Sequence, residues 1–237
     1  FLNKNDSYRW IDLIGLRGTG KTTILQQLYY SKKNMDAYFL VLSVDDIVNV
    51  LQSNIAEVIQ GFEKLMKKSL WELDKPLFIF LDEVQYDKNW GISLKVLYDK
   101  ALKNVFVFST GSSALLLNTN ADIARRVIST KIHPMSFSEF MEIKYDIKIS
   151  KTISTKIEEA IFNSNNGKEI FEKLEKIETE IKKIYFKIKP FAFDEYLNYS
   201  SLPYVLGLDN KEIILNTISK SVEMIIMKDM SINNELD

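Results

Sequence analysis

The segment Gly15–Thr22 constrains the fold of this chain more than any other. It reads Gly-Leu-Arg-Gly-Thr-Gly-Lys-Thr and matches the pattern GxxxxGK[ST]. A short apolar run, residues 10–14, precedes it, and residues 22–30, with apolar side chains at helical spacing, follow it. Glycines let a backbone curl so that its N–H groups point inward at an anion, and a helix start adds the positive end of its dipole. A strand, a glycine-rich loop and a helix in this order indicate a phosphate-binding loop.

Each residue type in this loop has its own chemical task. Lys21 would contact the β- and γ-phosphates of a bound nucleotide, and the Thr22 hydroxyl would ligate Mg²⁺. By chance alone the pattern arises in on the order of 1% of chains of this size, and the flanking elements lower that figure. The loop residues that we expect to hold the nucleotide are Gly15, Gly18, Thr19, Gly20, Lys21 and Thr22.

A second apolar run ends in two acidic residues. Residues 77–81 are followed directly by Asp82 and Glu83. The carboxyl end of a buried strand lies at the sheet edge where open α/β folds bind ligands. We therefore expect Asp82 to hold the Mg²⁺ shell and Glu83 to polarise the attacking water. Taken alone, this ending would be read as a solvated acidic turn, and the phosphate loop upstream favours the catalytic interpretation.

Two further segments carry candidate catalytic groups. The apolar run 105–108 leads into a Ser/Thr/Gly-rich stretch, where Thr110 or Ser112 could place a hydroxyl near the γ-phosphate or the water. The alternative is an ordinary turn and helix cap, and the residues do not decide between the two. Arg125 and Arg126 precede another strand, where one of them could act as an arginine finger in phosphoryl transfer or both could be surface arginines.

The apolar runs alternate with helical patterns along the first half of the chain. A long amphipathic helix is predicted to start with Asp45 as its N-cap and to continue through Leu65. Buried strands that alternate with helices indicate a parallel sheet covered on both faces. The predicted fold class is therefore α/β: a P-loop NTPase with a parallel sheet sandwiched by helices. The strands that we expect are residues 10–14, 37–44, 77–81, 105–108 and 127–132.

The character of the sequence changes after Tyr145. We expect a P-loop core over residues 1–145 and a helical extension or lid over 146–237. Within the extension, residues 170–188 have isoleucines and a leucine at helical spacing. This helix could be a short coiled-coil arm, but fewer than three or four heptads are present, so packing against residues 151–162 is favoured. Two more helices are predicted, over residues 193–199 and 211–228.

Composition excludes several kinds of site. Lys and Arg number 31 against 32 Asp and Glu, so no global positive field would attract nucleic acid, although a local patch stays open. There is no cysteine and only one histidine, His133, which excludes disulfides, thiolate metal sites and multi-histidine sites. No apolar run approaches the roughly 20 residues of a membrane span, and no leader is evident, so we expect a cytoplasmic protein without a membrane partner.

The succession of motifs resembles AAA+-like archaeal and bacterial P-loop ATPases, whose acidic motif reads Leu-Asp-Glu-(Ile/Val)-Gln. This chain has that motif at Leu81–Gln85, and it has a PLSF-x-E-F-like segment at Pro134–Phe140 with methionine in place of leucine. The family's G-x-R-x-x-G-K-T-T loop adds Arg17 and Thr23 to the expected nucleotide-binding residues. The family usually has glycine before its arginine, where this chain has Ala124, so the choice between two finger candidates stays open.

The resemblance implies an ATPase that binds ATP and Mg²⁺, releases ADP and couples turnover to conformational change. Its catalytic residues would be Lys21, Glu83, Thr110 and Arg126. The alternative is a slow nucleotide-gated signalling switch or scaffold with little turnover. A small-molecule kinase is less favoured, because no arginine follows Pro134 to cover the phosphates. An arginine finger acting on a neighbour would imply a homo-oligomer, and a DNA-directed ATPase is suggested by analogy only, so the protein or DNA partner stays unnamed.

Overall fold

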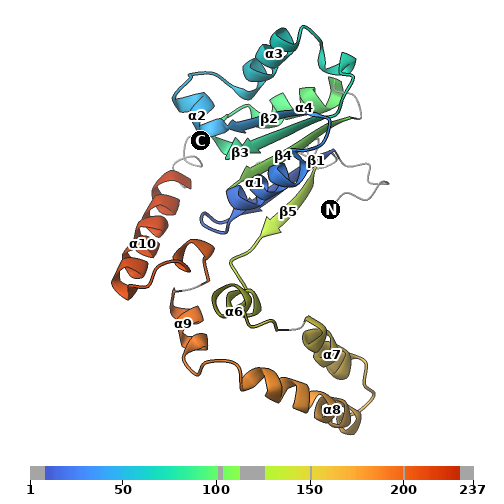
Figure 1. Cartoon of the computed structure of the whole chain (residues 1–237), viewed down its shortest axis with the longest axis vertical. Helices are drawn as coiled ribbons and strands as arrows, with labels where there is room; N and C mark the ends of the chain where they lie inside the picture. The colour runs from blue at the N-terminus through green and yellow to red at the C-terminus, as the bar shows by residue number, and fades with distance from the viewer. Residues whose placement is uncertain (1–8, 101–103, 113–125, 150, 200, 230–237) are drawn as a thin grey trace. The chain divides into compact units, whose positions relative to one another are not determined.

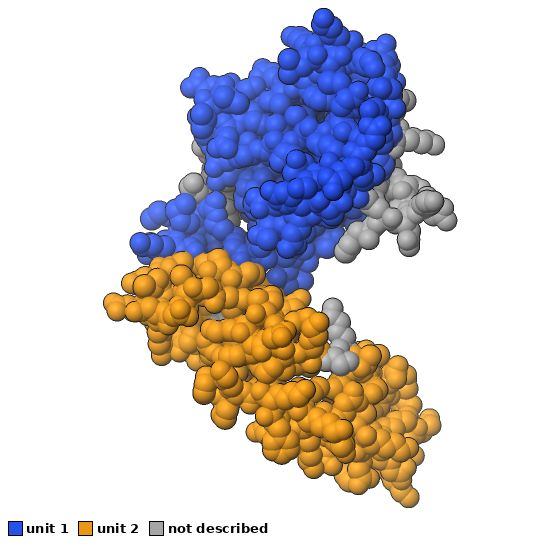
Figure 2. Space-filling model, viewed as in Figure 1, with its two compact units in different colours: residues 1–133, 220–237 blue, residues 134–219 orange. Residues whose placement is uncertain are grey.

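The structure is a computed structural model that describes residues 9–100, 104–112, 126–149, 151–199 and 201–229. By their internal contacts the residues form two compact units, shown in separate colours in Figure 2. The first unit comprises residues 1–133 and 220–237, and the second comprises residues 134–219. Residues 134–145 thus group with the helical part by contact. The domain boundary expected after residue 145 stays a prediction.

The first unit is built on one parallel sheet of five strands (Figure 1). The strand order is β2-β3-β4-β1-β5, so β4 lies between the strand that carries the phosphate loop and the strand that carries the acidic pair. All pairings are parallel, and helices connect β1 to β2, β2 to β3 and β3 to β4. The predicted α/β class is confirmed. The strands are β1 (Trp10–Gly15), β2 (Tyr38–Ser43), β3 (Leu77–Asp82), β4 (Val105–Gly111) and β5 (Ile128–Ile132).

Both faces of the sheet are covered by apolar clusters, as near-continuous apolar strands require. On one face, α1 (Lys21–Lys32) packs through Leu25 onto Phe80 and Phe108, whose rings stack 5.1 Å apart between centroids. On the other face, β1, β3 and β4 contact α3 (Ile55–Met66) and α4 (Trp90–Lys100). Successive strand residues alternate between the two clusters, so the register fixes which side chains can meet. Asp82 and Phe80 therefore point to the α1 side.

The predicted continuous helix from Asp45 through Leu65 is wrong. The chain forms two helices there, α2 (Val44–Asn49) and α3, and Ser43 rather than Asp45 caps the first. Asn54 caps α3 by accepting a hydrogen bond from the Glu57 backbone N–H. The Ile55 N–H donates to Asp87 Oδ2 over 3.0 Å. A carboxylate from a distant part of the chain thus stabilises a helix start inside the amphipathic pattern.

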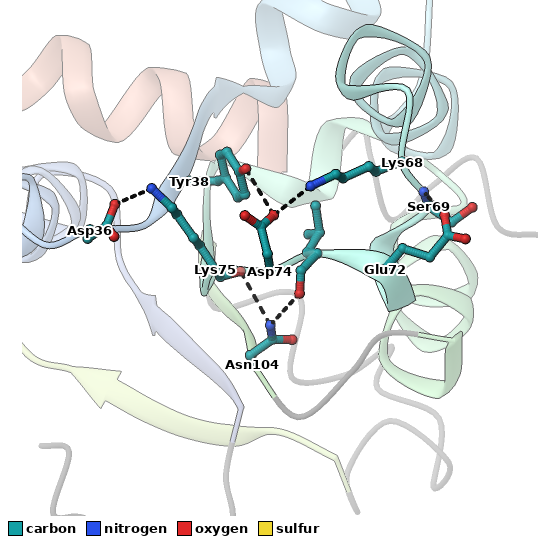
Figure 3. Close-up of polar contacts among 9 residues, drawn as sticks. Asp36, Tyr38, Lys68, Ser69, Glu72, Asp74, Lys75 and Asn104 are labelled. Carbon is teal, nitrogen blue, oxygen red and sulfur yellow. Dashed lines mark hydrogen bonds and ion pairs between the residues drawn. The ribbon is translucent and has the colours of Figure 1, made fainter.

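A polar network lies where β2, β3 and β4 begin, at the opposite ends of these strands from the phosphate loop (Figure 3). Asp74 Oδ1 accepts from Tyr38 Oη at 3.2 Å and from Lys68 Nζ at 2.9 Å. The hydrogen bond from Lys68 lowers the pKa of the Asp74 carboxyl. Asn104 Nδ2 lies 3.4 Å from the Leu73 carbonyl oxygen and 3.3 Å from that of Lys75. The network joins the segments that lead into adjacent strands.

The second unit is helical and has its own small core. Phe140, Met141 and Ala192 are its fully buried members, and a capping box of Ser136 and Glu139 starts the first helix. Its elements are α6 (Phe137–Tyr145), α7 (Lys151–Phe162), α8 (Gly167–Tyr185), α9 (Ala192–Tyr199), the 3₁₀ turn Pro203–Val205 and most of α10 (Lys211–Met224), after which a π-helical turn (Ile225–Asp229) follows.

The long charged helix α8 packs against α7, as the packing interpretation of its isoleucines predicts. Ile177 of α8 is buried, as are Ile153 and Ala160 of α7. Lys156 Nζ and Glu180 Oε2 join the two helices at 2.7 Å. Across the described ranges of the chain, no helix has both the length and the apolar character that crossing a membrane requires.

Candidate nucleotide-binding site

The phosphate loop has the backbone geometry that its glycines allow. Gly18 and Gly20 have φ of 85° and 90°, in the left-handed region that side chains with a Cβ rarely adopt. At Gly15 the constraint is space, because a Cβ would stand 2.3 Å from the Ile132 carbonyl oxygen. Thr19 closes the loop by donating from Oγ1 to the Leu16 carbonyl over 2.8 Å. The loop conformation therefore depends on glycine at these three positions.

Lys21 lies inside this loop. Its side chain is 5% exposed, and its Nζ donates to the carbonyl oxygens of Gly15 and Leu16, each over 3.0 Å. Helix α1 begins at Lys21, and no side chain caps its first turn, so its amino end is available to an anion. The loop encloses a cation beside an uncapped helix start, which is the arrangement that a phosphate chain needs.

Asp82 is the point where three elements of the site meet. Its Oδ1 accepts from Thr22 Oγ1 at the start of α1, over 3.2 Å, and from the buried Thr110 Oγ1 on β4. Because β4 lies between β1 and β3, its end can reach both the loop strand and the acidic strand. Of the two hydroxyls that the sequence left open, Thr110 contacts an acidic residue of the site. Ser112 is buried nearby in the chain.

Glu83 directly follows the strand and turns sharply. Its φ of 58° and ψ of 51° are left-handed, and its backbone N–H donates to Thr110 Oγ1 over 2.9 Å. Its carboxylate accepts from Gln85 Nε2 through Oε2. Gln85 Oε1 is buried and has no hydrogen-bond partner in the described residues. The sequence analysis assigned no role to Gln85. Its place in the Leu81–Gln85 motif is the sequence feature from which a role could have been predicted.

The remaining predicted residues are less closely joined to this centre. Arg17 is half-buried in the loop, and Thr23 is exposed in the first turn of α1. Arg126 precedes β5, beside the strand starts, and forms a two-point pair with Asp99 of α4. Its Nε lies 3.0 Å from Oδ1 and its Nη2 lies 3.2 Å from Oδ2. Arg126 therefore faces away from its own chain's phosphate loop, and Arg125 lies outside the described residues.

The oxygen donors at this site suit Mg²⁺. Magnesium is commonly held by one or two carboxylates, with phosphate oxygens and water completing an octahedron. Thr22 and Asp82 offer a hydroxyl and a carboxylate oxygen at one point. No group of three or more histidine, aspartate or glutamate side chains gathers anywhere in the described ranges, so a dedicated all-protein cage is not what these residues build.

A buried carboxyl that the sequence reading did not single out lies beneath the loop. Asp12 of β1 is 1% exposed, and burial raises its pKa to about 6. Its Oδ1 accepts from Ser109 Oγ over 2.8 Å, and Ser109 Oγ accepts from Trp10 Nε1 over 2.8 Å. Asp12 Oδ2 has no partner in the described residues. A charged residue within a predicted apolar strand is the sequence feature that could have identified Asp12 beforehand.

Comparison with known families bears on this geometry. The model of the AAA domain family matches residues 7–141, which include the loop, the acidic motif and the end of β4. The chain belongs to this family. The resemblance to AAA+-like P-loop ATPases is thereby confirmed, and the site described above lies within the matched part of this AAA domain.

Three curated relatives share part of their sequence with this AAA protein. An uncharacterized protein of Methanocaldococcus jannaschii is 33% identical over 99% of this chain and 46% of its own length. A second uncharacterized protein of that organism is 28% identical over 60% of this chain and 30% of its own. An uncharacterized protein of Haemophilus influenzae is 24% identical over 55% of this chain and 32% of its own length. The chain thus spans less than half the length of each relative.

Two solved structures are similar in fold. AMPPCP-bound DnaA from Aquifex aeolicus has 20% identity and a TM-score of 0.40, and covers 74% of this chain and 57% of its own. A point variant of RuvB from Thermotoga maritima has 13% identity and a TM-score of 0.41, and the match covers 73% of this chain and 63% of the RuvB chain.

Proposed function

We propose that this AAA domain binds ATP with Mg²⁺ and hydrolyses it, coupling turnover to a change of conformation. The observation that carries the proposal is the position of Asp82, whose Oδ1 accepts from both Thr22 and Thr110. These bonds join the helix after the phosphate loop, the acidic strand and the strand between them at one carboxylate. A metal-bound triphosphate needs that convergence, because catalysis of phosphoryl transfer is mostly positioning and charge stabilisation.

The residues of the site divide the work. Lys21, already enclosed by the loop, would shift its donors from two carbonyls to the β- and γ-phosphates. Thr22 and Asp82 would hold the metal, which when bound neutralises charge on the phosphate oxygens. Glu83 would accept a proton from the attacking water. Thr110 fixes the Glu83 backbone through its hydroxyl, which holds the turn that carries this carboxylate.

The decisive experiment separates binding from hydrolysis. Glu83→Gln keeps the shape of the side chain but removes the negative charge that draws the proton, and a general base contributes about 10²–10⁴-fold. The variant should bind ATP as the parent does and hydrolyse it at least about 10²-fold more slowly in a single turnover. Glu158→Gln, the same change at an exposed residue of α7, serves as the control and should hydrolyse ATP as the parent does. Unchanged single-turnover hydrolysis in Glu83→Gln would remove Glu83 from catalysis.

A slow nucleotide-gated switch is a second candidate, and the contact between Gln85 and Glu83 favours it. The amide of Gln85 donates to Oε2 of the carboxylate that would accept a proton, so one of its two oxygens is already occupied by a hydrogen bond. In this candidate, hydrolysis stays slow until a partner draws Gln85 away. Gln85→Ala should then raise basal turnover several-fold, whereas a lowered rate would show that Gln85 positions Glu83 for catalysis.

A further inference from the structure

The junction between α8 and α9 presents large rings to solvent. Tyr185, Phe186 and Phe191 expose 71%, 82% and 59% of their surface. Ile188 and Ala192, between and beside them, pack into the small core of the second unit. Single exposed apolar residues are ordinary on protein surfaces, but several large ones along one short segment mark an interaction site. The fold thus buries the smaller side chains of the junction and leaves the aromatic ones outside.

The backbone of the junction is held by hydrogen bonds. The Phe186 N–H donates to the Lys182 carbonyl over 3.0 Å, and the Ile188 N–H to that of Tyr185 over 3.1 Å. The Ala192 N–H donates to the Lys189 carbonyl over 2.9 Å. The rings therefore extend from a defined backbone, and this arrangement reduces the entropy that a partner must remove on binding.

The same junction is locally cationic. From Ile181 through Phe193 the sequence contains lysines and no acidic residue, whereas the whole chain has a net charge of -1. Lys182 pairs with Glu178 over 2.7 Å, but no acidic partner of Lys183 or Lys187 is found in the part of the chain that the structure describes. We name the lysine–aromatic patch by its six residues, Lys183, Tyr185, Phe186, Lys187, Lys189 and Phe191.

We propose that the lysine–aromatic patch binds single-stranded nucleic acid, with lysines on the phosphates and rings stacked on unpaired bases. Stacking on aromatic side chains beside positive charge is how proteins bind single strands without sequence preference. A duplex keeps its base faces stacked inside, so exposed rings would gain nothing from it beyond the charge attraction. The proposal goes beyond the nucleotide site and does not depend on it.

A membrane surface is the alternative partner. The positions of the three rings in the secondary structure argue against it. Interfacial helices bury one continuous apolar face of a single helix. Here Tyr185 ends α8, Phe186 follows it in the connecting segment, and Phe191 directly precedes α9, with Lys187 and Lys189 between the rings. The rings are thus distributed over a helix end and a linker, and not along one face of a single helix. Lysines lie between them in the sequence, as phosphates lie between the bases of a nucleic-acid strand.

The test measures the affinity of the full chain for fluorescent (dT)₂₀, (U)₂₀, a 20-base-pair duplex and phosphatidylserine vesicles. The single strands should bind more tightly than the duplex, and their relative affinity separates DNA from RNA. Phe186→Ala should weaken (dT)₂₀ binding about 5- to 100-fold. Phe171→Ala is the matched control, because Phe171 is 67% exposed on α8 but lies between Glu169 and Glu172, and it should change nothing.

Salt dependence provides a second measure of the contacts. Lys187→Gln should reduce the slope of log affinity against log salt by about 0.7, the value expected for one phosphate contact on a single strand. Equal binding of duplex and single strand with no effect of Phe186→Ala would overturn the proposal in favour of plain charge attraction. Binding to vesicles alone, or binding to none of the probes, would overturn it too. Competition by excess ATP would place the oligonucleotide in the phosphate loop and equally contradict the patch.

Discussion

Thr22 Oγ1 lies 3.2 Å from Asp82 Oδ1, across the space between the helix that follows the phosphate loop and the strand that carries the acidic pair. The two residues are far apart in the sequence and belong to non-adjacent strand–helix units, since β4 separates β1 from β3. A hydroxyl and a carboxylate that meet in this way can share one Mg²⁺ with a bound triphosphate. Their relationship makes metal dependence the first property to test.

Asp82→Asn should weaken ATP binding in the presence of Mg²⁺ and lower turnover together. The amide keeps the shape and one acceptor oxygen but loses the charge that would hold the metal, while the loop residues proposed to contact the phosphates stay unchanged. Affinity measured by calorimetry should therefore fall with Mg²⁺ and change little in EDTA. An equal loss under both conditions would mean that Asp82 holds the loop rather than the metal.

Lys21→Ala removes the cation enclosed by the loop. Charge-assisted hydrogen bonds contribute about 1.5–3 kcal/mol each, so ATP affinity should fall by orders of magnitude while the circular dichroism spectrum stays that of a folded protein. Lys32→Ala, at the last turn of the same helix, is the control and should bind ATP normally. Unchanged affinity in a folded Lys21→Ala protein would contradict the phosphate-loop interpretation.

The phosphate loop and the acidic pair could each be predicted from the sequence, because the residues that form each of them are adjacent in the chain. The segment Gly15–Thr22 begins at the last residue of β1, and the pair Asp82–Glu83 begins at the last residue of β3. Each of these strands is predicted by its apolar run. The α/β class followed from the same alternation. The contact of Thr110 with Asp82 could only be offered as one of two choices, because it depends on β4 standing between two other strands.

What the sequence did not reveal depends on contacts between distant residues. The start of α3 is stabilised by Asp87, whose carboxylate accepts a hydrogen bond from the Ile55 N–H. No local sequence pattern predicts that bond. The pairing of Arg126 with Asp99 likewise joins the start of β5 to α4. Asn54 is a local signal for a helix start, but the two tertiary contacts of Asp87 and Arg126 are not predicted by helical periodicity or residue type.

Arg126 faces away from its own phosphate loop, so a catalytic role for it requires a second copy of the chain. Arg126→Ala should then lower turnover without weakening ATP binding, and the parent's activity per protomer should rise with protein concentration. Asp99→Asn is the control, since it breaks the same ion pair but keeps the guanidinium. Equal losses in both variants, or activity that stays flat on dilution to monomers, would show a structural role only.

Asp12 makes the stability of this domain depend on pH in a direction opposite to most carboxylates. Its pKa in the folded protein is raised from 3.8 to about 6 by burial, so the folded state binds a proton more tightly than the unfolded chain does. The free energy of unfolding therefore falls as pH rises from about 4 to about 6, and the loss persists above that range. The raised pKa corresponds to about 3 kcal/mol above pH 6.

Asp12→Asn should remove this dependence, because the amide stays neutral and its oxygen can still accept from Ser109. Urea denaturation should show the variant more stable than the parent by up to about 3 kcal/mol at pH 8, with the difference shrinking towards pH 4. Asp74→Asn is the opposite control, since Lys68 lowers the pKa of Asp74 and its contribution is lost as pH falls. A stability difference between Asp12→Asn and parent that is the same at pH 4 and pH 8 would mean that Asp12 titrates alike in the folded and unfolded chain, and would contradict the prediction.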